Sequence, residues 1–260
     1  MDFEIAQGLF LPLIGTTLGA GGVFLMKDKM SRRLEQTLSG FAAGVMTAAA
    51  IWGLILPSIE SSEHLGKMAI MPAFVGFWAG ILFLLLLDKT VPHFHACENQ
   101  PEGPSCHMRK TTMMILAVAL HNLPEGMAVG AVYAEGASTG GAGVASAFTL
   151  SLGIALQNFP EGAIISMPLK GEGMSKGKAF FYGALSGVVE PAAAIFTMLI
   201  ASQITSVLPY LLSFAAGAMM YVVVEELVPE MSAGDEHSNL GAVIFSIGFT
   251  VMMMMDHLLG

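Results

Sequence analysis

Charged side chains are scarce in this sequence. Asp, Glu, Lys and Arg make up 12% of the 260 residues, about half of the roughly 25% found in soluble domains, whereas 54% of the residues are hydrophobic and the mean hydropathy is +0.69. A chain with so little charge cannot cover a water-facing surface of ordinary size. The composition therefore predicts an integral membrane protein without a separate soluble domain.

Thiols and the common motifs of nucleotide and hydrolase chemistry are lacking too. The only two cysteines, Cys97 and Cys106, lie in one polar segment, so we expect neither a structural disulfide nor a buried thiolate cage for a metal. The sequence contains no Walker A motif and no His-Glu-x-x-His motif. We therefore expect no nucleotide or nucleic-acid partner and no enzymatic activity.

Apolar stretches of about 20 residues recur along the chain, and each is long enough to cross a hydrocarbon core of about 30 Å as a helix. They cover approximately residues 5–26, 38–59, 69–91, 111–134, 144–168, 179–203, 207–229 and 240–260. The sequence thus predicts an all-α membrane protein with eight transmembrane helices in a single domain over residues 1–260. Three helices (5–91), a polar loop (92–110), a central pair (111–168) and three more helices (179–260) follow in order.

The basic residues are distributed unevenly between the predicted loops. Of the 11 Lys and Arg residues, only Lys67 lies outside the loops that follow the first, third and fifth helices. By the positive-inside rule these loops face the cytoplasm, and both termini lie on the non-cytoplasmic side of the cell membrane. The start of the chain, Met1–Glu4, is acidic and unlike a signal peptide, so the first stretch is predicted to be retained.

Two predicted helices that cross the membrane in opposite directions resemble each other. Gly40–Met46 in the second helix matches Ser213–Met219 in the seventh, around a shared Phe-Ala-Ala-Gly run. This likeness favours an inverted repeat, with three helices on either side of a central antiparallel pair, which is an architecture of transporters. The alternative is that such small residues only mark close helix packing.

Two near-copies of one motif lie within the central helix pair, at His121–Gly126 and Gln157–Gly162. Each motif places an imidazole or amide four residues before a carboxylate, and hence on the same helix face. Each also contains a proline, Pro124 or Pro160, which cannot donate to the carbonyl one turn earlier. Ionisable groups at this depth are costly, so they are candidates for ligands or relay groups.

The polar residues of the membrane helices form a mixed donor set. The sixth helix adds Glu190 beside Pro191, and the second helix adds the thioether of Met46, whose inclusion is the least supported. Imidazole, carboxylate and amide donors suit borderline divalent ions such as Zn²⁺, Cd²⁺, Fe²⁺ and Mn²⁺. The alternative is that these groups only pair with one another. The predicted metal ligands are His121, Asn122, Glu125, Gln157, Asn158, Glu161, Glu190 and Met46.

At these residues the sequence resembles the ZIP (Zrt/Irt-like) family of divalent metal transporters, and most of all its GufA-like branch. The twin motifs, Glu190-Pro191, the Phe-Ala-Ala-Gly-x-Met runs and the order of the helices carry the resemblance. It implies import of Zn²⁺ and related ions by alternating access, a two-metal site between the fourth and fifth helices, and a homodimer. Several relatives have Asp where this chain has Asn158, so a one-metal site remains open.

Rival functions use the same residues. A cation-selective channel would need the same donors, and a membrane-embedded metalloenzyme would need a base and a substrate path that the sequence does not indicate. A metal sensor would need an effector domain, and the chain leaves no room for one.

Further polar residues lie outside the twin motifs, and each group has the alternative of being an ordinary solvated segment. In the predicted cytoplasmic loop, metal could be bound by His93, His95, Cys97, Cys106 and His107. At the outer end of the second helix, cations could be attracted by Glu60, Glu63 and His64. After the seventh helix, an exit path could be formed by Glu225, Glu226, Glu230 and His237.

Overall fold

The computed structural model describes residues 3–27, 29–93, 104, 110–233 and 238–260. The predicted secondary ligands His95, Cys97, Cys106, His107 and His237 lie outside the described residues.

Every regular element in these ranges is a helix. In chain order they are α1 (Phe3–Ala20), η1 (Gly21–Phe24), α2 (Arg32–Ala48), η2 (Ala49–Ile55), α3 (Leu56–Glu60), η3 (Glu63–Met68), α4 (Ile70–Thr90), α5 (Lys110–Thr139), α6 (Gly141–Gly171), α7 (Lys176–Ser186), α8 (Val189–Gln203), η4 (Thr205–Val207), α9 (Leu208–Val222), η5 (Val223–Leu227), α10 (Val228–Ser232) and α11 (Leu240–Leu259).

Seven helical segments of the described chain are long and apolar enough to cross a membrane, which confirms the predicted membrane-protein architecture. They are Phe3–Phe24, Arg32–Glu60, Ile70–Thr90, Thr112–Ala137, Lys176–Ala201, Leu208–Ser232 and Leu240–Leu259. The remaining predicted span corresponds to α6, whose apolar run is interrupted by Gln157, Asn158 and Glu161. At 31 residues α6 is about 46 Å long at 1.5 Å per residue, so an eighth crossing stays a prediction that its length permits.

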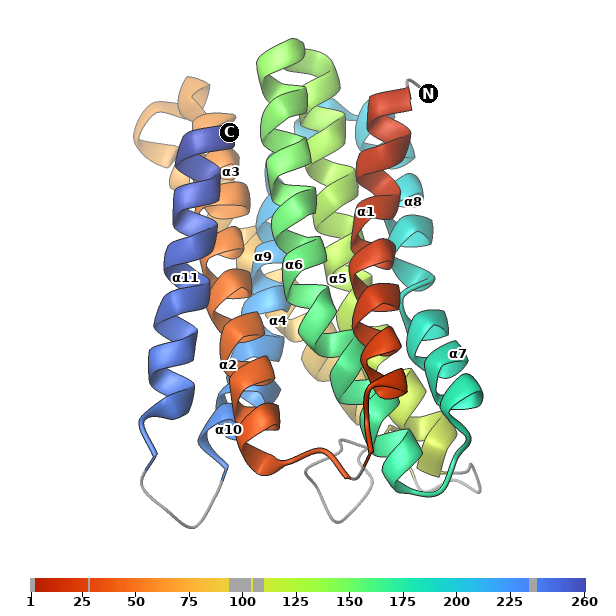
Figure 1. Ribbon diagram of the computed structural model, residues 1–260. Helices are drawn as coiled ribbons and strands as arrows, with labels where there is room; N and C mark the ends of the chain where they lie inside the picture. The colour runs from red at the N-terminus through yellow and green to blue at the C-terminus, as the bar shows by residue number, and fades with distance from the viewer. Residues whose placement is uncertain (1–2, 28, 94–103, 105–109, 234–237) are drawn as a thin grey trace.

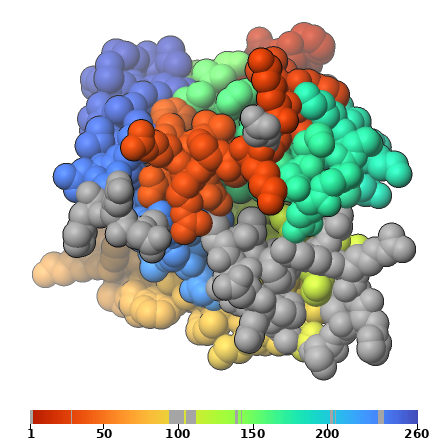
Figure 2. Space-filling model, turned by 60° about the horizontal axis from the view of Figure 1, so that its bottom comes forward, coloured from red at the N-terminus to blue at the C-terminus, as the bar shows by residue number. Residues whose placement is uncertain are grey.

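Both termini lie at one end of the helix bundle, together with the α5–α6 turn (Figure 1). The end of η1, the start of α2, the connection from α6 to α7, the end of α10 and the start of α11 lie at the other end, which Figure 2 brings forward. There α7 lies against the segment after α1, and the Lys176 ammonium donates to the carbonyl oxygen of Phe24 over 2.9 Å. The bundle therefore has one basic end, because the described lysines and arginines other than Lys67 lie in or beside the connections there.

Glycines bring four helix pairs into backbone contact. In the pairs α1–α6, α5–α8, α2–α11 and α4–α9, a Cβ on a facing glycine would lie within 3.0 Å of a backbone carbonyl oxygen of the partner helix. No real Cβ comes so close, so only glycine allows these approaches. The glycines are Gly15, Gly19 and Gly162; Gly126 and Gly130; Gly40, Gly44 and Gly248; and Gly76, Gly80 and Gly217.

These pairs divide the bundle into two bodies. We call α1, α5, α6, α7 and α8 body A, and α2, α3, α4, α9, α10 and α11, with η2 and η5, body B. Among the described residues, all glycine contacts with the backbone of another helix stay within one body. Between the bodies, Gly53 meets the side chain of Leu150, and Gly153 meets that of Met252. At the described glycines, the contacts between A and B are thus made to side chains and not to the backbone of the other body.

Two π-helical segments interrupt the long helices of body B. They are η2 and η5, and each ends two residues before a proline, Pro57 or Pro229. Proline cannot donate to the carbonyl one turn earlier, and a locally wider turn accommodates this defect. By contrast, α5 and α6 continue without a break through Pro124 and Pro160.

Because of these glycine contacts, a Gly→Ala substitution, which normally stabilises a helix, should destabilise this protein. In an exposed helix, Gly→Ala stabilises by up to about 1 kcal/mol. At Gly80 the new methyl group would enter the backbone of Phe214, and overpacking of this kind costs about 1–3 kcal/mol. We expect Gly80→Ala to lower the unfolding temperature of the purified protein in detergent. Gly177→Ala in α7, where nothing lies within 4 Å, serves as the control and should leave it unchanged or raise it.

Candidate metal site

The twin motifs face each other across the α5–α6 hairpin. His121, Glu125, Gln157 and Glu161 are all buried, with at most 9% of any of them exposed. The side-chain amide of Gln157 donates to Oε1 of Glu125 over 2.7 Å, which ties the two motifs together. The two helices are antiparallel and joined by a turn at Gly140 (φ 88°), so the motifs run in opposite directions: Glu125 lies opposite Gln157, and His121 and Glu161 line one cavity.

A second polar group joins α5 to α8 and α1. Asn122 donates through Nδ2 to Oε1 of Glu190 over 2.8 Å, and the Thr16 hydroxyl lies 2.8 Å from the same oxygen. All three residues are fully buried, and Asn158 lies beside Glu190. Glu190 therefore lies in one buried polar group with Asn122 and Asn158 of the twin motifs, and its role as a metal ligand stays a prediction. Thr16 was missed, because a single threonine in an apolar helix carries no distinguishing pattern.

Two of the predicted exit residues, Glu226 and Glu230 of body B, lie close to the twin motifs of body A. Nε2 of His121 is 2.5 Å from Oε1 of Glu226, and Glu226 and Glu230 line a cavity of about 590 Å³ together with His121 and Glu161. The cavity lies on the side of the motifs that leads toward the basic end of the bundle. Glu225 is exposed and does not line this cavity.

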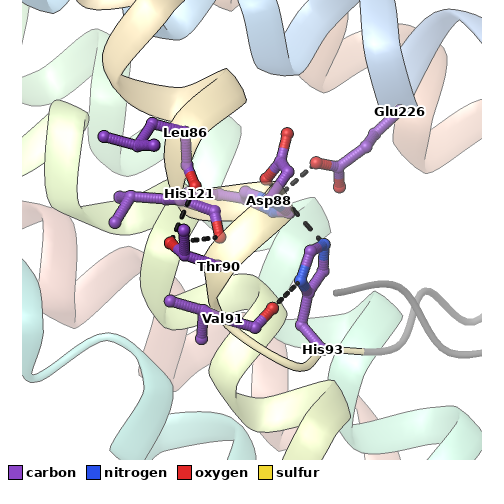
Figure 3. A network of polar contacts seen from close by, with 8 residues as sticks. Leu86, Asp88, Thr90, Val91, His93, His121 and Glu226 are labelled. Carbon is purple, nitrogen blue, oxygen red and sulfur yellow. Dashed lines mark hydrogen bonds and ion pairs between the residues drawn. The ribbon is translucent and has the colours of Figure 1, made fainter. Parts of the chain in front are cut away.

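One residue placed in the polar loop by the sequence is buried instead. His93 lies just after the end of α4, with Nε2 3.8 Å from Oδ1 of Asp88 and Nδ1 2.8 Å from the carbonyl oxygen of Val91. Figure 3 shows this pair in the same close view as His121 and Glu226. Asp88 was missed by the sequence reasoning, although an acid in the last turn of an apolar helix was a usable signal.

The polar residues at the opposite end are only partly brought together. Glu60 lines a cavity of about 930 Å³ with Glu135 and Asp256, two acids that the sequence reasoning did not assign. Glu63 and His64 lie in η3, are exposed and do not line this cavity. Their predicted role in attracting cations finds no support in this geometry.

Met46 is fully buried and belongs to the large apolar core, together with Met219 of α9. Its role as a ligand stays a prediction.

The buried acids of body A lack basic partners. In the described part of the chain, no lysine or arginine forms an ion pair with Glu125, Glu161 or Glu190. A buried carboxylate without a partner costs several kcal/mol, which a bound cation would offset.

Several buried oxygens of the site also accept no hydrogen bond within the described residues. They are Oδ1 of Asn122 and Asn158, Oε1 of Gln157, and Oε2 of Glu125, Glu161 and Glu190. Buried oxygens of this kind require water or an ion. Among the described residues no three His, Cys, Asp or Glu side chains form a ready-made cage, so an ion here would need the amide oxygens as well. The donors present fit a divalent transition-metal ion that must be released again.

Comparisons with known proteins agree with this chemistry. Residues 104–256 match the family model described as ZIP zinc transporter. The chain is 33% identical to zinc transporter ZIP11 of Homo sapiens, over 99% of this chain and 98% of that protein. It is 32% identical to zinc transporter GufA of Myxococcus xanthus, over 95% and 96%, and 33% identical to zinc transporter ZIPB of Bordetella bronchiseptica, over 89% and 74%.

If the site holds a divalent ion, that ion should stabilise the folded protein. At a free concentration one hundred times its dissociation constant, a ligand adds about 2.7 kcal/mol to the stability. We expect Zn²⁺ to raise the unfolding temperature of the wild type, and to raise that of Glu125→Gln much less, because the variant loses a charged donor. Glu172→Gln, at an exposed acid after α6, is the matched control and should respond like the wild type. An equal shift in all three proteins would place the ion elsewhere.

Proposed function

The chain belongs to the ZIP zinc transporter family, and we propose that it carries Zn²⁺ into the cytoplasm through the twin-motif site of α5 and α6. Membership makes it a multi-pass membrane transporter of metal ions and not an enzyme. The observation that carries the proposal is the set of buried acids and unpartnered amide oxygens at the centre of an apolar helix bundle.

The donor set suggests which ions are carried and where. His121, Glu125, Gln157 and Glu161 hold the first ion, with two negative charges to neutralise a divalent cation. A second position is formed by Asn122, Asn158 and Glu190. It carries less negative charge than the first position, because Asn158 is an amide. Zn²⁺ is the main substrate, and Cd²⁺, Fe²⁺ and Mn²⁺ are carried less well.

The two cavities suggest a path on either side of the site. Ions approach from the acidic cavity at Glu60 and Asp256 and leave past Glu226 and Glu230 toward the basic end. The lysines and arginines at that end support a cytoplasmic exit, with both termini on the other side of the cell membrane.

The division into two bodies suggests how access alternates. Body A contains both motifs and Glu190, and its helices are locked to one another by glycine contacts. Body B contributes Glu226 and Glu230, and it meets body A only through side chains at its glycines. Rigid-body movement of A against B would expose the site to one cavity and then to the other without breaking either body.

An inverted repeat underlies this arrangement. Gly80 meets the carbonyl of Phe214 in the same way as Gly248 meets that of Phe41, and the two phenylalanines begin the repeated Phe-Ala-Ala-Gly runs. Gly217 and Gly44 in these runs meet the carbonyls of Phe77 and Phe245, and η2 and η5 follow at equivalent places. These paired contacts support three helices on either side of the α5–α6 pair. A homodimer is part of the proposal on the strength of the family resemblance alone.

Uptake into proteoliposomes tests the function directly. Wild-type protein should take up Zn²⁺ with saturation, and Cd²⁺ should compete. His121→Ala and the double variant Glu125→Gln/Glu161→Gln should fall to the level of protein-free liposomes, since each removes donors of the first ion. Glu172→Gln should match the wild type. Uptake that rises linearly with concentration would favour the channel instead, and normal uptake by the variants would contradict the site.

A disulfide between the bodies tests alternating access. A Cβ at Gly53 would lie 3.5 Å from Cγ of Leu150, so cysteines at these positions can join η2 to α6. In a background with Cys97 and Cys106 replaced by serine, Gly53→Cys/Leu150→Cys should lose uptake on oxidation and regain it on reduction. Gly22→Cys/Ala163→Cys lies within body A, with Cβ atoms 4.0 Å apart, and should be insensitive. Undiminished uptake by the oxidised first pair would exclude relative movement there.

A further inference from the structure

We propose that Thr16 is a positioning residue that restricts Glu190 to one metal-binding oxygen and so favours small ions such as Zn²⁺ over larger ones such as Cd²⁺. This inference rests on the proposed function, because it concerns the selectivity of the same site. The supporting observations are the burial of Thr16, its contact with Glu190 and the unequal environments of the two carboxylate oxygens.

The Thr16 hydroxyl has one hydrogen to donate, and two acceptors are within reach. Oε1 of Glu190 lies 2.8 Å from Oγ1, whereas the carbonyl oxygen of Pro12, one turn earlier in α1, lies 3.3 Å away. The shorter contact to a carboxylate is the stronger bond. Thr16 therefore donates across the helix interface to Glu190 rather than back to its own helix.

The two oxygens of Glu190 are consequently different. Oε1 accepts from both Thr16 and Asn122, each over 2.8 Å, whereas Oε2 accepts no hydrogen bond within the described residues. An oxygen that already accepts two hydrogen bonds is a poor metal donor. Glu190 is thus prepared to bind an ion through Oε2 alone.

The surrounding backbone keeps this arrangement in place. A Cβ at Gly187, where α7 ends, would lie 2.9 Å from Cβ of Thr16 and 3.0 Å from Oε1 of Glu190. The Thr16 carbonyl is in turn held against Gly162 of α6, in the second motif. Close helix packing therefore holds the Thr16 side chain within hydrogen-bonding distance of Oε1 of Glu190.

A single carboxylate oxygen suits a small ion. Zn²⁺ binds about four donors at about 2.0–2.2 Å, whereas larger ions take more oxygens, often both from one carboxylate. Without the Thr16 hydroxyl, Oε1 is held by Asn122 alone and can turn toward the ion. The site should then accept the larger Cd²⁺ more readily.

The test compares Thr16→Val, which keeps the branched shape and removes the donor, with Thr16→Ser, which keeps the donor. Dissociation constants of Zn²⁺ and Cd²⁺ are measured by calorimetry on purified protein, alongside competition in proteoliposomes. We expect Thr16→Val to shift the Cd²⁺/Zn²⁺ preference about tenfold toward Cd²⁺, which corresponds to about 1.4 kcal/mol. Thr16→Ser should keep the wild-type ratio.

A double-mutant cycle separates positioning from a general packing defect. If Thr16 acts through Glu190, Thr16→Val should not change the Cd²⁺/Zn²⁺ ratio further in a Glu190→Gln background.

Unfolding temperatures of the metal-free proteins check the fold, and Thr16→Ala replaces Thr16→Val if the valine variant does not fold. An unchanged ratio in a folded Thr16→Val or Thr16→Ala variant overturns the inference. Absence of both Zn²⁺ binding and uptake in the wild type would overturn the proposed function itself.

Discussion

Buried negative charge without a basic partner is the constraint on which the rest of the structure depends. Glu125, Glu161 and Glu190 lie in an apolar bundle whose described lysines and arginines stay at or beyond the helix ends. Their desolvation costs several kcal/mol for each charge, and neighbouring amides offset only part of it. In the proposed function a divalent cation would offset this cost, and the amide donors, which carry no charge, would limit its affinity and ease its release.

Close helix packing places these charges. Gly162 of the second motif fits against the carbonyl of Thr16, and Gly126 of the first fits against that of Glu190. The glycine that ends each motif therefore sets the distance at which a residue of α1 or α8 meets the polar site. The same contacts hold the helices of body A together, and the proposed movement of A against B relies on the side-chain contacts at Gly53 and Gly153 between the two bodies.

Prediction from the sequence succeeded where one helix is sufficient to define a pattern. The apolar runs, the facing donors of the twin motifs and the acid at Glu190 follow from composition and from the spacing of residues four apart. Single-helix patterns gave less where several helices meet. His93 is buried, Glu63 and His64 are exposed and do not line the outer cavity, and Asp88, Glu135 and Thr16 meet polar neighbours that only the fold brings near.

The sequence by itself determined the membrane environment, the donor types and the family, because hydropathy and motif spacing are properties of single segments. Tertiary structure alone decided which oxygens are left without partners. Oε1 of Glu190 accepts hydrogen bonds from Thr16 of α1 and Asn122 of α5, whereas Oε2 accepts none within the described residues. His121 of α5 meets the side chain of Glu226, which comes from η5 of body B. Such contacts depend on how helices pack, and the packing brings together residues far apart in the chain, such as Thr16 and Glu190, which are 174 positions apart.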